Sequence, residues 1–168
     1  FSDENIQPLT DGIKTFLDIA WSGQEPRRVY IKMLGNTARA RQHLLMVTGQ
    51  CGVSYRDLHI YNPINQGKSG EYLPICPHNS KEAMSLLKDL TATDNVNNHV
   101  KKAGLVAGAR YCKNSNNMIV IIYLTDDPEK ETKTGFAQVI SGLEIFQDIA
   151  KCNDKSNIKI VDCGVVLS

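Results

Sequence analysis

Short apolar runs separated by polar, turn-forming residues recur along most of this chain. Runs of four to eight residues that are rich in Val, Ile, Tyr and Phe and bounded by Asn, Asp, Ser or Gly are typical of β-strands. Their regular spacing indicates an antiparallel, mainly β domain. The runs that predict strands are residues 15–20, 28–34, 104–109, 118–124, 136–141 and 158–163.

Two of these runs carry extra information. Residues 15–20 and 28–34 are joined by Ser-Gly-Gln-Glu-Pro at 22–26, a composition that closes hairpins. Residues 119–122 are continuously apolar and β-branched, which favours a strand buried on both faces. A strand whose outward side meets a partner is the alternative.

Helical spacing occurs in two places. Residues 38–48 place Ala40, Leu44 and Val47 at i, i+4 and i+7, and Gly49 follows where helices usually stop. The second stretch is 143–151, whose apolar face comprises Leu143, Phe146, Ile149 and Ala150. We expect both helices to cap the ends of a β-barrel.

A third, shorter helix is expected near residues 80–90, with Asn79 as its N-cap. Leu86, Leu87 and Leu90 would form its apolar side, either docked on the barrel, which is favoured, or offered to a partner. Residues 1–14 are polar and predict an extended lead-in. Residues 15–168 are expected to form one domain.

Composition narrows the functional classes. The chain has 168 residues, 42% of them hydrophobic, and a net charge of +1. No overall field would attract nucleic acid or an acidic membrane. The basic pairs Arg27-Arg28, Arg39/Arg41 and Lys101-Lys102 predict solvated surface. No apolar run is long enough to span a bilayer, and no signal peptide is evident, so no membrane association is expected.

The five cysteines are widely spaced and form no Cys-x-x-Cys pair. This spacing argues against a disulfide framework and favours a reducing compartment, so we expect an intracellular protein, cytoplasmic or nuclear. Cys76-Pro77-His78 is an isolated pair of metal-type ligands, and no metal or other cofactor is expected. Because the chain begins at Phe1, we also expect it to be part of a longer polypeptide or a processed chain.

Several motifs together resemble those of the cyclophilins, the cyclophilin-type peptidyl-prolyl isomerases. They are Phe16-Leu-Asp-Ile-Ala20, Thr48-Gly49, Gln66-Gly67, residues 104–124, Gly142-Leu143 and Ile158-Lys-Ile-Val-Asp-Cys-Gly164. The resemblance covers residues 15–167 and is poorest between 67 and 103. It implies a closed, eight-stranded antiparallel β-barrel capped by two α-helices.

The resemblance also implies that the catalytic site is degenerate. In the family an arginine on a Phe-His-Arg strand acts on the prolyl nitrogen and weakens the planar amide. In this chain Tyr61-Asn62 match His-Arg, and a second register puts Tyr61 at the arginine position. Neither side chain carries the required charge, and the nearest arginine in sequence is Arg56.

Other positions that match the family's site have changed as well. Ile64-Asn65 replace Phe-Met before Gln66, Ala109-Arg110-Tyr111 replace Ala-Asn-Ala, and Ile119-Val120-Ile121 replace Gln-Phe-Phe. Two large side chains, Arg110 and Tyr111, would fill the peptide groove, although Arg110 is also a candidate replacement cation. The loop at 126–133 lacks the tryptophan that contacts cyclosporin, so cyclosporin binding is not expected.

These observations favour a catalytically inactive cyclophilin-like domain that acts as a protein interaction or scaffolding module in a larger protein. The candidate partner-binding residues are Tyr61, Arg110, Tyr111, Leu86, Leu87 and Leu90. An active isomerase with a rearranged site is an alternative that needs a cation from Arg110 or Arg56. A nucleic-acid-binding module is disfavoured by the balanced charge; its basic and aromatic residues would be Arg39, Arg41, Lys101, Lys102, Arg110 and Tyr111.

Overall fold

The computed structural model describes residues 9–21, 23–77, 98–108 and 118–167, which form ten strands, two α-helices and one short 3-10 helix. The strands are β1 (Lys14–Ala20), β2 (Arg27–Met33), β3 (Leu58–Ile60), β4 (Tyr72–Pro77), β5 (His99–Lys101), β6 (Leu105–Gly108), β7 (Val120–Tyr123), β8 (Asp127–Thr132), β9 (Gly135–Ser141) and β10 (Lys159–Val165). The helices are α1 (Ala38–Thr48), η2 (Tyr55–Asp57) and α2 (Leu143–Ala150).

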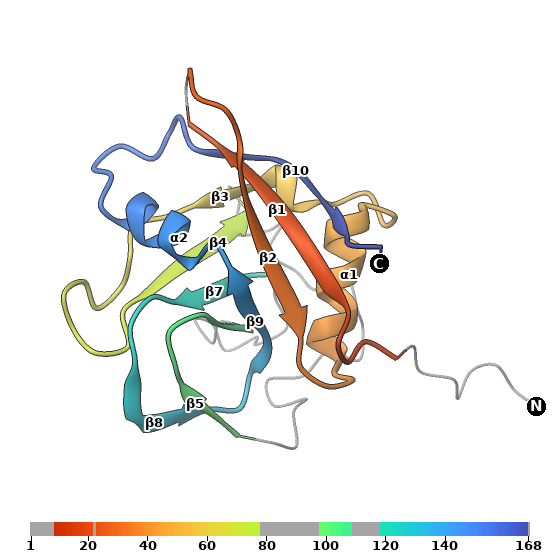
Figure 1. Ribbon diagram of the computed structural model, residues 1–168, viewed down its shortest axis with the longest axis horizontal. Helices are drawn as coiled ribbons and strands as arrows, with labels where there is room; N and C mark the ends of the chain where they lie inside the picture. The colour runs from red at the N-terminus through yellow and green to blue at the C-terminus, as the bar shows by residue number, and fades with distance from the viewer. Residues whose placement is uncertain (1–8, 22, 78–97, 109–117, 168) are drawn as a thin grey trace, which may run out of the picture.

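Eight strands form one antiparallel sheet that curls into a barrel in the order β10-β1-β2-β9-β6-β7-β4-β3 (Figure 1). The two end strands, β10 and β3, lie next to each other without a hydrogen-bonded ladder among the described residues. The barrel is therefore nearly closed. The predicted eight-stranded antiparallel architecture with two helices is confirmed.

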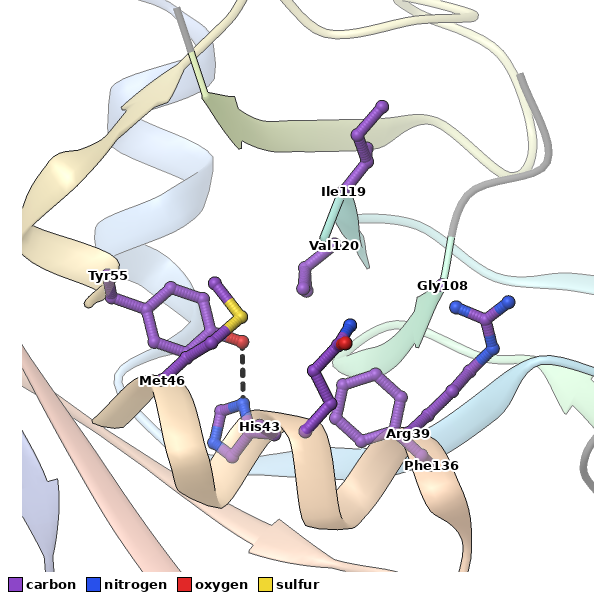
Figure 2. Close-up of a pocket in the computed structure, with 9 residues that line it drawn as sticks. Arg39, His43, Met46, Tyr55, Gly108, Ile119, Val120 and Phe136 are labelled. Atoms are coloured by element: carbon purple, nitrogen blue, oxygen red, sulfur yellow. Dashed lines mark hydrogen bonds between the residues drawn. The ribbon is translucent and has the colours of Figure 1, made fainter. Parts of the chain in front are cut away.

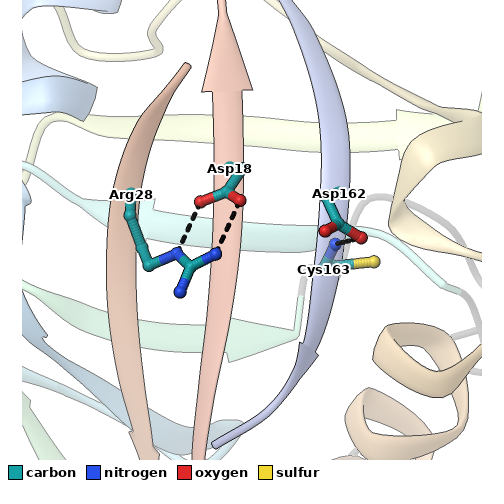
Figure 3. A network of polar contacts seen from close by, with 4 residues as sticks. All are labelled: Asp18, Arg28, Asp162 and Cys163. Atoms are coloured by element: carbon teal, nitrogen blue, oxygen red, sulfur yellow. Dashed lines mark hydrogen bonds and ion pairs between the residues drawn. The ribbon is translucent and has the colours of Figure 1, made fainter. Parts of the chain in front are cut away.

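The hairpin β1–β2 alternates as its sequence predicts. Leu17 pairs with Val29, both side chains are buried, and the strand residues between the buried ones face outward. On that outer face Arg28 donates two hydrogen bonds to Asp18, of 2.8 and 2.9 Å (Figure 3). The Arg28 guanidinium also lies over the ring of Phe16. The hairpin thus supplies two rows of core residues and a polar outer surface.

The central strands β6 and β7 are buried on both faces, and for β7 the continuous apolar run at 119–122 predicted this. Val106, Val120 and Ile122 belong to the main core inside the barrel. The alternate residues form a second apolar cluster on the outside of the sheet, which comprises Leu105, Ala107, Ile121 and Tyr123. Both side-chain rows of β7 are therefore excluded from water.

Both predicted helices are present, on either side of the barrel (Figure 1). The Thr37 hydroxyl accepts a hydrogen bond from the Ala40 amide at the start of α1, and Gly49 ends the helix in the left-handed conformation. The buried face of α1 differs from the predicted one: Arg39, Gln42 and His43 are buried, while Leu44 is only half-buried. The His43 imidazole is buried because the hydroxyls of Tyr55 and Thr15 form hydrogen bonds with it.

Four strands, β3, β4, β5 and β8, lie outside the apolar runs from which strands were predicted. Strand β4 contains two prolines, and β5 and β8 form a separate two-stranded sheet of mostly polar residues. Strand β8, Asp-Pro-Glu-Lys-Glu-Thr, has no apolar alternation because none of its residues faces the barrel core. Such strands arise from pairing with another segment and leave no local signal.

Residues 10–14 were expected to be an extended lead-in, but they are hydrogen-bonded to the barrel. The side chain of Asn36 accepts hydrogen bonds from the amides of Thr10 (2.7 Å) and Asp11 (2.9 Å), and the buried Thr10 hydroxyl donates to the Gly35 carbonyl (2.6 Å). Residues 10–14 therefore dock on the end of β2. The helix expected near residues 80–90 lies outside the described residues.

Candidate functional site

The strand that the resemblance singled out is β3. A capping box precedes it: the Asp57 carboxylate accepts from the Ser54 amide (2.9 Å), and the Ser54 hydroxyl accepts from the Arg56 amide (3.2 Å). Pairing with β4 then sets His59 opposite Cys76 and Ile60 opposite Ile75. In β3, Leu58 and Ile60 are buried in the core and His59 between them is half-buried.

Ile60 points into the core and is 5% exposed, whereas Tyr61 and Asn62 follow the end of β3. Because His and Arg are adjacent in the family motif, a register based on His59 places Ile60, and not Tyr61, at the arginine position. This corrects the second register considered from the sequence. The Tyr61 side chain is exposed at 38%, and its amide donates to the Pro74 carbonyl (3.0 Å).

The residues matched to Phe-Met-Gln lie in the connection between β3 and β4. Ile64 forms an isolated bridge with Tyr72, and Asn65 adopts a positive φ of 59°. Gln66 is exposed and lines a hollow of about 320 Å³ beside α2. The Gln66-Gly67 match therefore falls in a turn and does not place a glutamine on the strand that pairs with β3.

Strand β4 joins the two halves of the candidate site. Tyr61 bonds to Pro74, and Pro74 is opposite Ile121 on β7. Pro74 and Ile121 are buried on the outer face of the sheet, and Ile119 packs beside them half-buried. Tyr61 and Ile121 are thus brought to the same part of the barrel wall. Ala109, Arg110, Tyr111, Leu86, Leu87 and Leu90 lie outside the described residues.

Two titratable side chains near the end of β3, Cys76 and Tyr61, have raised pKa values. Burial raises the pKa of the Cys76 thiol to about 11. Burial, and secondarily the neighbouring Cys76, raises the pKa of the Tyr61 hydroxyl. Neither group is ionised at neutral pH, so neither provides an anion that could act as a nucleophile or general base.

Two described arginines are paired on another part of the barrel. Arg27 lies 3.3 Å from the Asp148 carboxylate, and Arg28 holds Asp18 (Figure 3). Both belong to β2, which β9 and β6 separate from β7. Arg56 is exposed in η2, directly before β3.

Arg39 is the residue that the sequence placed incorrectly. It was expected on the solvated surface, but it is 3% exposed. It shares one face of α1 with His43 and Met46, at i, i+4 and i+7, and that spacing was a signal that could have indicated its inward position. Its guanidinium fills the space that a side chain at Gly108 would occupy (Figure 2).

Next to Arg39 is a cavity of only about 10 Å³, the size of one water molecule. Figure 2 shows the side chains around it, which come from α1, η2 and strands on three sides. They are Arg39, Gln42, His43, Met46, Tyr55, Gly108, Ile119, Val120 and Phe136. A cavity of this size admits no substrate.

His43 forms a buried polar chain at this cavity. Its Nδ1 lies 2.6 Å from the Tyr55 hydroxyl (Figure 2). Its Nε2 lies 2.9 Å from the Thr15 hydroxyl. Since the Thr15 hydroxyl can donate to the Ile31 carbonyl (3.4 Å), the consistent assignment has Tyr55 donating to Nδ1 and Nε2–H donating to Thr15. Burial lowers the pKa of His43 to about 3. The imidazole is therefore a neutral structural link.

A second hollow beside the candidate site lies at the end of β3, between Tyr61-Asn62 and the connection from α2 to β10. Its volume is about 250 Å³. Lys155 reaches into it and donates a hydrogen bond to the Asn62 side-chain oxygen (3.0 Å). Sequence reasoning missed this cation, because 93 positions separate the two residues and no local pattern connects them.

The remaining sequence expectations concern metal ligands, cysteines and membrane-spanning segments. Within the described ranges, no three or more His, Cys, Asp or Glu side chains are grouped to hold a metal, and His78 lies outside those ranges. Cys51, Cys76, Cys152 and Cys163 are free thiols; Cys51 is exposed and the other three are half-buried. None of the helices described has the length and apolar character that crossing a bilayer requires.

Comparison with known proteins agrees with this architecture. The crystal structure of a Mimivirus cyclophilin superposes with a TM-score of 0.63 and 16% sequence identity, over 100% of this chain and 96% of that chain. At this level of identity the likeness shows the fold alone. Among curated proteins, none matches the sequence. The family profile described as cyclophilin type peptidyl-prolyl cis-trans isomerase/CLD matches residues 45–165, and the chain therefore belongs to that family.

Proposed function

We propose that this chain is a catalytically silent member of its family that acts as a protein–protein interaction module within a larger protein. The observation that carries the proposal is the neutrality of the residues at the end of β3. Ile60, Tyr61 and Asn62 are the three candidates for the position of the family's arginine, and none carries a charge.

The physical reason is the height of the barrier. Rotation about a prolyl bond meets a barrier of about 18–20 kcal/mol, which arises from the partial double bond of the amide. A fixed cation that donates to the prolyl nitrogen weakens this resonance most in the twisted transition state. A buried isoleucine, a tyrosine hydroxyl or an asparagine amide cannot supply the same charge stabilisation.

The barrel itself remains suited to binding. Its core is continuous through eight strands and both helices, so the surface loops are held on a rigid support. Tyr61 is a large aromatic side chain, exposed at the end of β3, and tyrosine is a common anchor at interfaces. Arg110, Tyr111, Leu86, Leu87 and Leu90 remain the other proposed contacts.

One observation favours the alternative of an active isomerase with a rearranged site. The Lys155 ammonium bonds to Asn62, which is the arginine position in the first register. A lysine there is a compact charge without the planar fork of a guanidinium. If it replaced the arginine, activity would depend on it.

A protease-coupled isomerisation assay on an Ala-Pro peptide tests both ideas. We expect the cis peptide to convert at the uncatalysed rate, over tens of seconds. An active cyclophilin serves as the positive control, and circular dichroism confirms that the chain is folded. Turnover comparable to that control would refute the silent-domain proposal, and loss of such turnover in Lys155→Met but not Arg56→Met would identify the replacement cation.

The interaction role is tested by affinity capture from cell extract with wild-type and Tyr61→Ala chains. We expect at least one protein that the wild type retains and Tyr61→Ala loses. Val161→Ala is the matched control, because Val161 is exposed to a similar extent on β10. Identical retention by all three chains would exclude Tyr61 as a partner contact.

A further inference from the structure

The hollow beside Tyr61 has two distinct walls. His59, Tyr61 and Asn62 form one wall at the end of β3, and Asn153, Lys155 and Ser156 form the other in the connection from α2 to β10. Its volume of about 250 Å³ exceeds that of a water site and accommodates a single side chain. Its lining combines the polar ends of Lys155 and Asn62 with a larger apolar surface, which suits a side chain that carries a charged end on an apolar stem.

The cation in this hollow is held by neutral groups. The Lys155 ammonium donates to the Asn62 side-chain oxygen and to the Cys152 carbonyl. These bonds fix its position and use two of its three protons. Among the described residues, no carboxylate lies within ion-pair distance of this ammonium. Its charge is therefore positioned but not neutralised.

The adjacent acidic residue is engaged elsewhere. The Asp154 carboxylate accepts hydrogen bonds from the amide of Ser156 (2.9 Å) and from its hydroxyl (2.7 Å). These two bonds lower the pKa of Asp154 and shape the turn. The carboxylate lies in solvent, where its effect on Lys155 is screened.

We propose that this hollow binds the carboxylate of a Glu or Asp side chain presented by a protein partner. The third proton of the Lys155 ammonium can donate to this carboxylate. The Asn62 side-chain nitrogen can donate a second hydrogen bond, because the Asn62 oxygen already accepts from Lys155. Tyr61 flanks the entrance as an aromatic contact. The inference rests on the proposed interaction function and specifies the chemistry that the partner must offer.

A carboxylate fits better than a phosphate group. The hollow supplies one ammonium and neutral amides, which match a single negative charge. Phosphate sites usually combine a guanidinium fork or several backbone amides, and no arginine lines this hollow among the described residues. Inorganic phosphate is therefore the appropriate competing ligand in the test.

The test is a titration of the full chain followed by ¹H–¹⁵N NMR. The probes are the blocked hexapeptide Gly-Ala-Glu-Glu-Ala-Gly, its Gln-Gln counterpart and inorganic phosphate. We expect the Glu peptide to shift the amides of residues 59–62 and 153–156, with affinity at least about threefold above that of the Gln peptide. The difference should shrink as salt is raised from low to physiological ionic strength.

Three variants isolate the ammonium. Lys155→Met should abolish the preference for Glu over Gln, and Lys155→Arg should retain it. Lys159→Met is the matched control, since Lys159 is an exposed lysine on β10 outside the hollow. Unchanged amide shifts away from the hollow will establish that each variant is folded.

Equal affinity for the two peptides, or a preference that survives Lys155→Met, would overturn the proposal. Tighter binding of phosphate than of the Glu peptide would overturn the choice of carboxylate. The isomerisation assay tests the proposed function separately. A chain that shows no isomerase activity and binds neither peptide would refute only this carboxylate site. A chain that isomerises prolyl peptides loses the silent-domain proposal whatever binds in the hollow.

Discussion

His43 links three segments of the barrel through one neutral ring. Tyr55 in η2 and Thr15 in β1 lie at hydrogen-bond distance from its two nitrogens, and the ring itself belongs to α1. Tyr55 is fully buried, and burial raises the pKa of its hydroxyl far above its ordinary value. A protonated imidazole would have no acceptor for its second proton at Tyr55 unless that hydroxyl reversed its role.

This arrangement predicts a specific loss of stability in acid. The pKa of His43 falls from an ordinary value of 6.5 to about 3 on folding. Below pH ~6.5 the unfolded chain takes up a proton that the folded chain does not, so stability falls by about 1.4 kcal/mol per pH unit until pH ~3. Urea unfolding measured between pH 7 and pH 5 will show this slope.

The control is His43→Gln, which keeps a polar group but does not titrate. The variant should be less stable at pH 7, yet its stability should change less between pH 6.5 and pH 5 than that of the wild type. Parallel pH profiles for the two chains would show that His43 is protonated in the folded state or that another group causes the slope.

At the scale of elements, the start of α2 depends on one glycine that lies against β2. Helix α2 begins at Gly142, which has a φ of 95° and no side-chain cap. The residue also lies close to β2: a Cβ there would be 3.1 Å from the Arg28 carbonyl oxygen and 3.1 Å from Val29 Cα. Both the backbone conformation and the contact with β2 therefore require glycine.

Gly142→Ala should destabilise the fold by about 2–4 kcal/mol, from left-handed strain of about 1–2 kcal/mol and from the clash with the β2 backbone. Gly52→Ala is the matched control, because Gly52 has a φ of 91° and a Cβ there would meet nothing within 4 Å. Chemical denaturation of both variants measures the difference. Equal losses would mean that the contact with β2 relaxes without cost.

At the scale of the whole molecule, the barrel has one seam. Every other neighbouring pair of its strands shares a hydrogen-bonded ladder, whereas β10 and β3 are adjacent without one among the residues that the structure describes. At this seam Ser54 and Cys163 lie 3.4 Å apart, and contacts of side chains and of η2 with β10 replace backbone pairing. The seam is the part of the described wall with the fewest backbone bonds.

We therefore expect hydrogen exchange to begin at the seam. Amides of β3 and β10 that face it should exchange faster than the amides of β1, β2, β6 and β9, because each of these four strands has a partner on both sides. Native-state exchange followed by NMR measures this order. Uniform protection around the barrel would show that the seam opens only with global unfolding.

The same scale shows that the core and the candidate site depend on different residues. The core depends on inward rows such as Leu17, Val29 and Ile122, whereas the candidate site depends on residues at the end of β3 and on the outer face. Substitution of one set leaves the other intact. A domain of this family can therefore persist as a scaffold for binding.

The sequence alone determined the elements whose cause is local. The hairpin, both α-helices and the double burial of β7 follow from periodicity, turn residues and caps that lie within a few positions of one another. The absence of a charged residue at 60–62 is also a property of the sequence. These features needed no knowledge of distant contacts.

Only the tertiary structure decided what depends on distant partners. Strands β4, β5 and β8 form because another strand pairs with them, and Arg39 is buried because its helix faces Gly108. Lys155 meets Asn62 only when the chain closes the barrel and brings the connection before β10 to the end of β3. Local patterns encode propensity, but the position of a charge relative to a residue 93 places away is set by the folded chain as a whole.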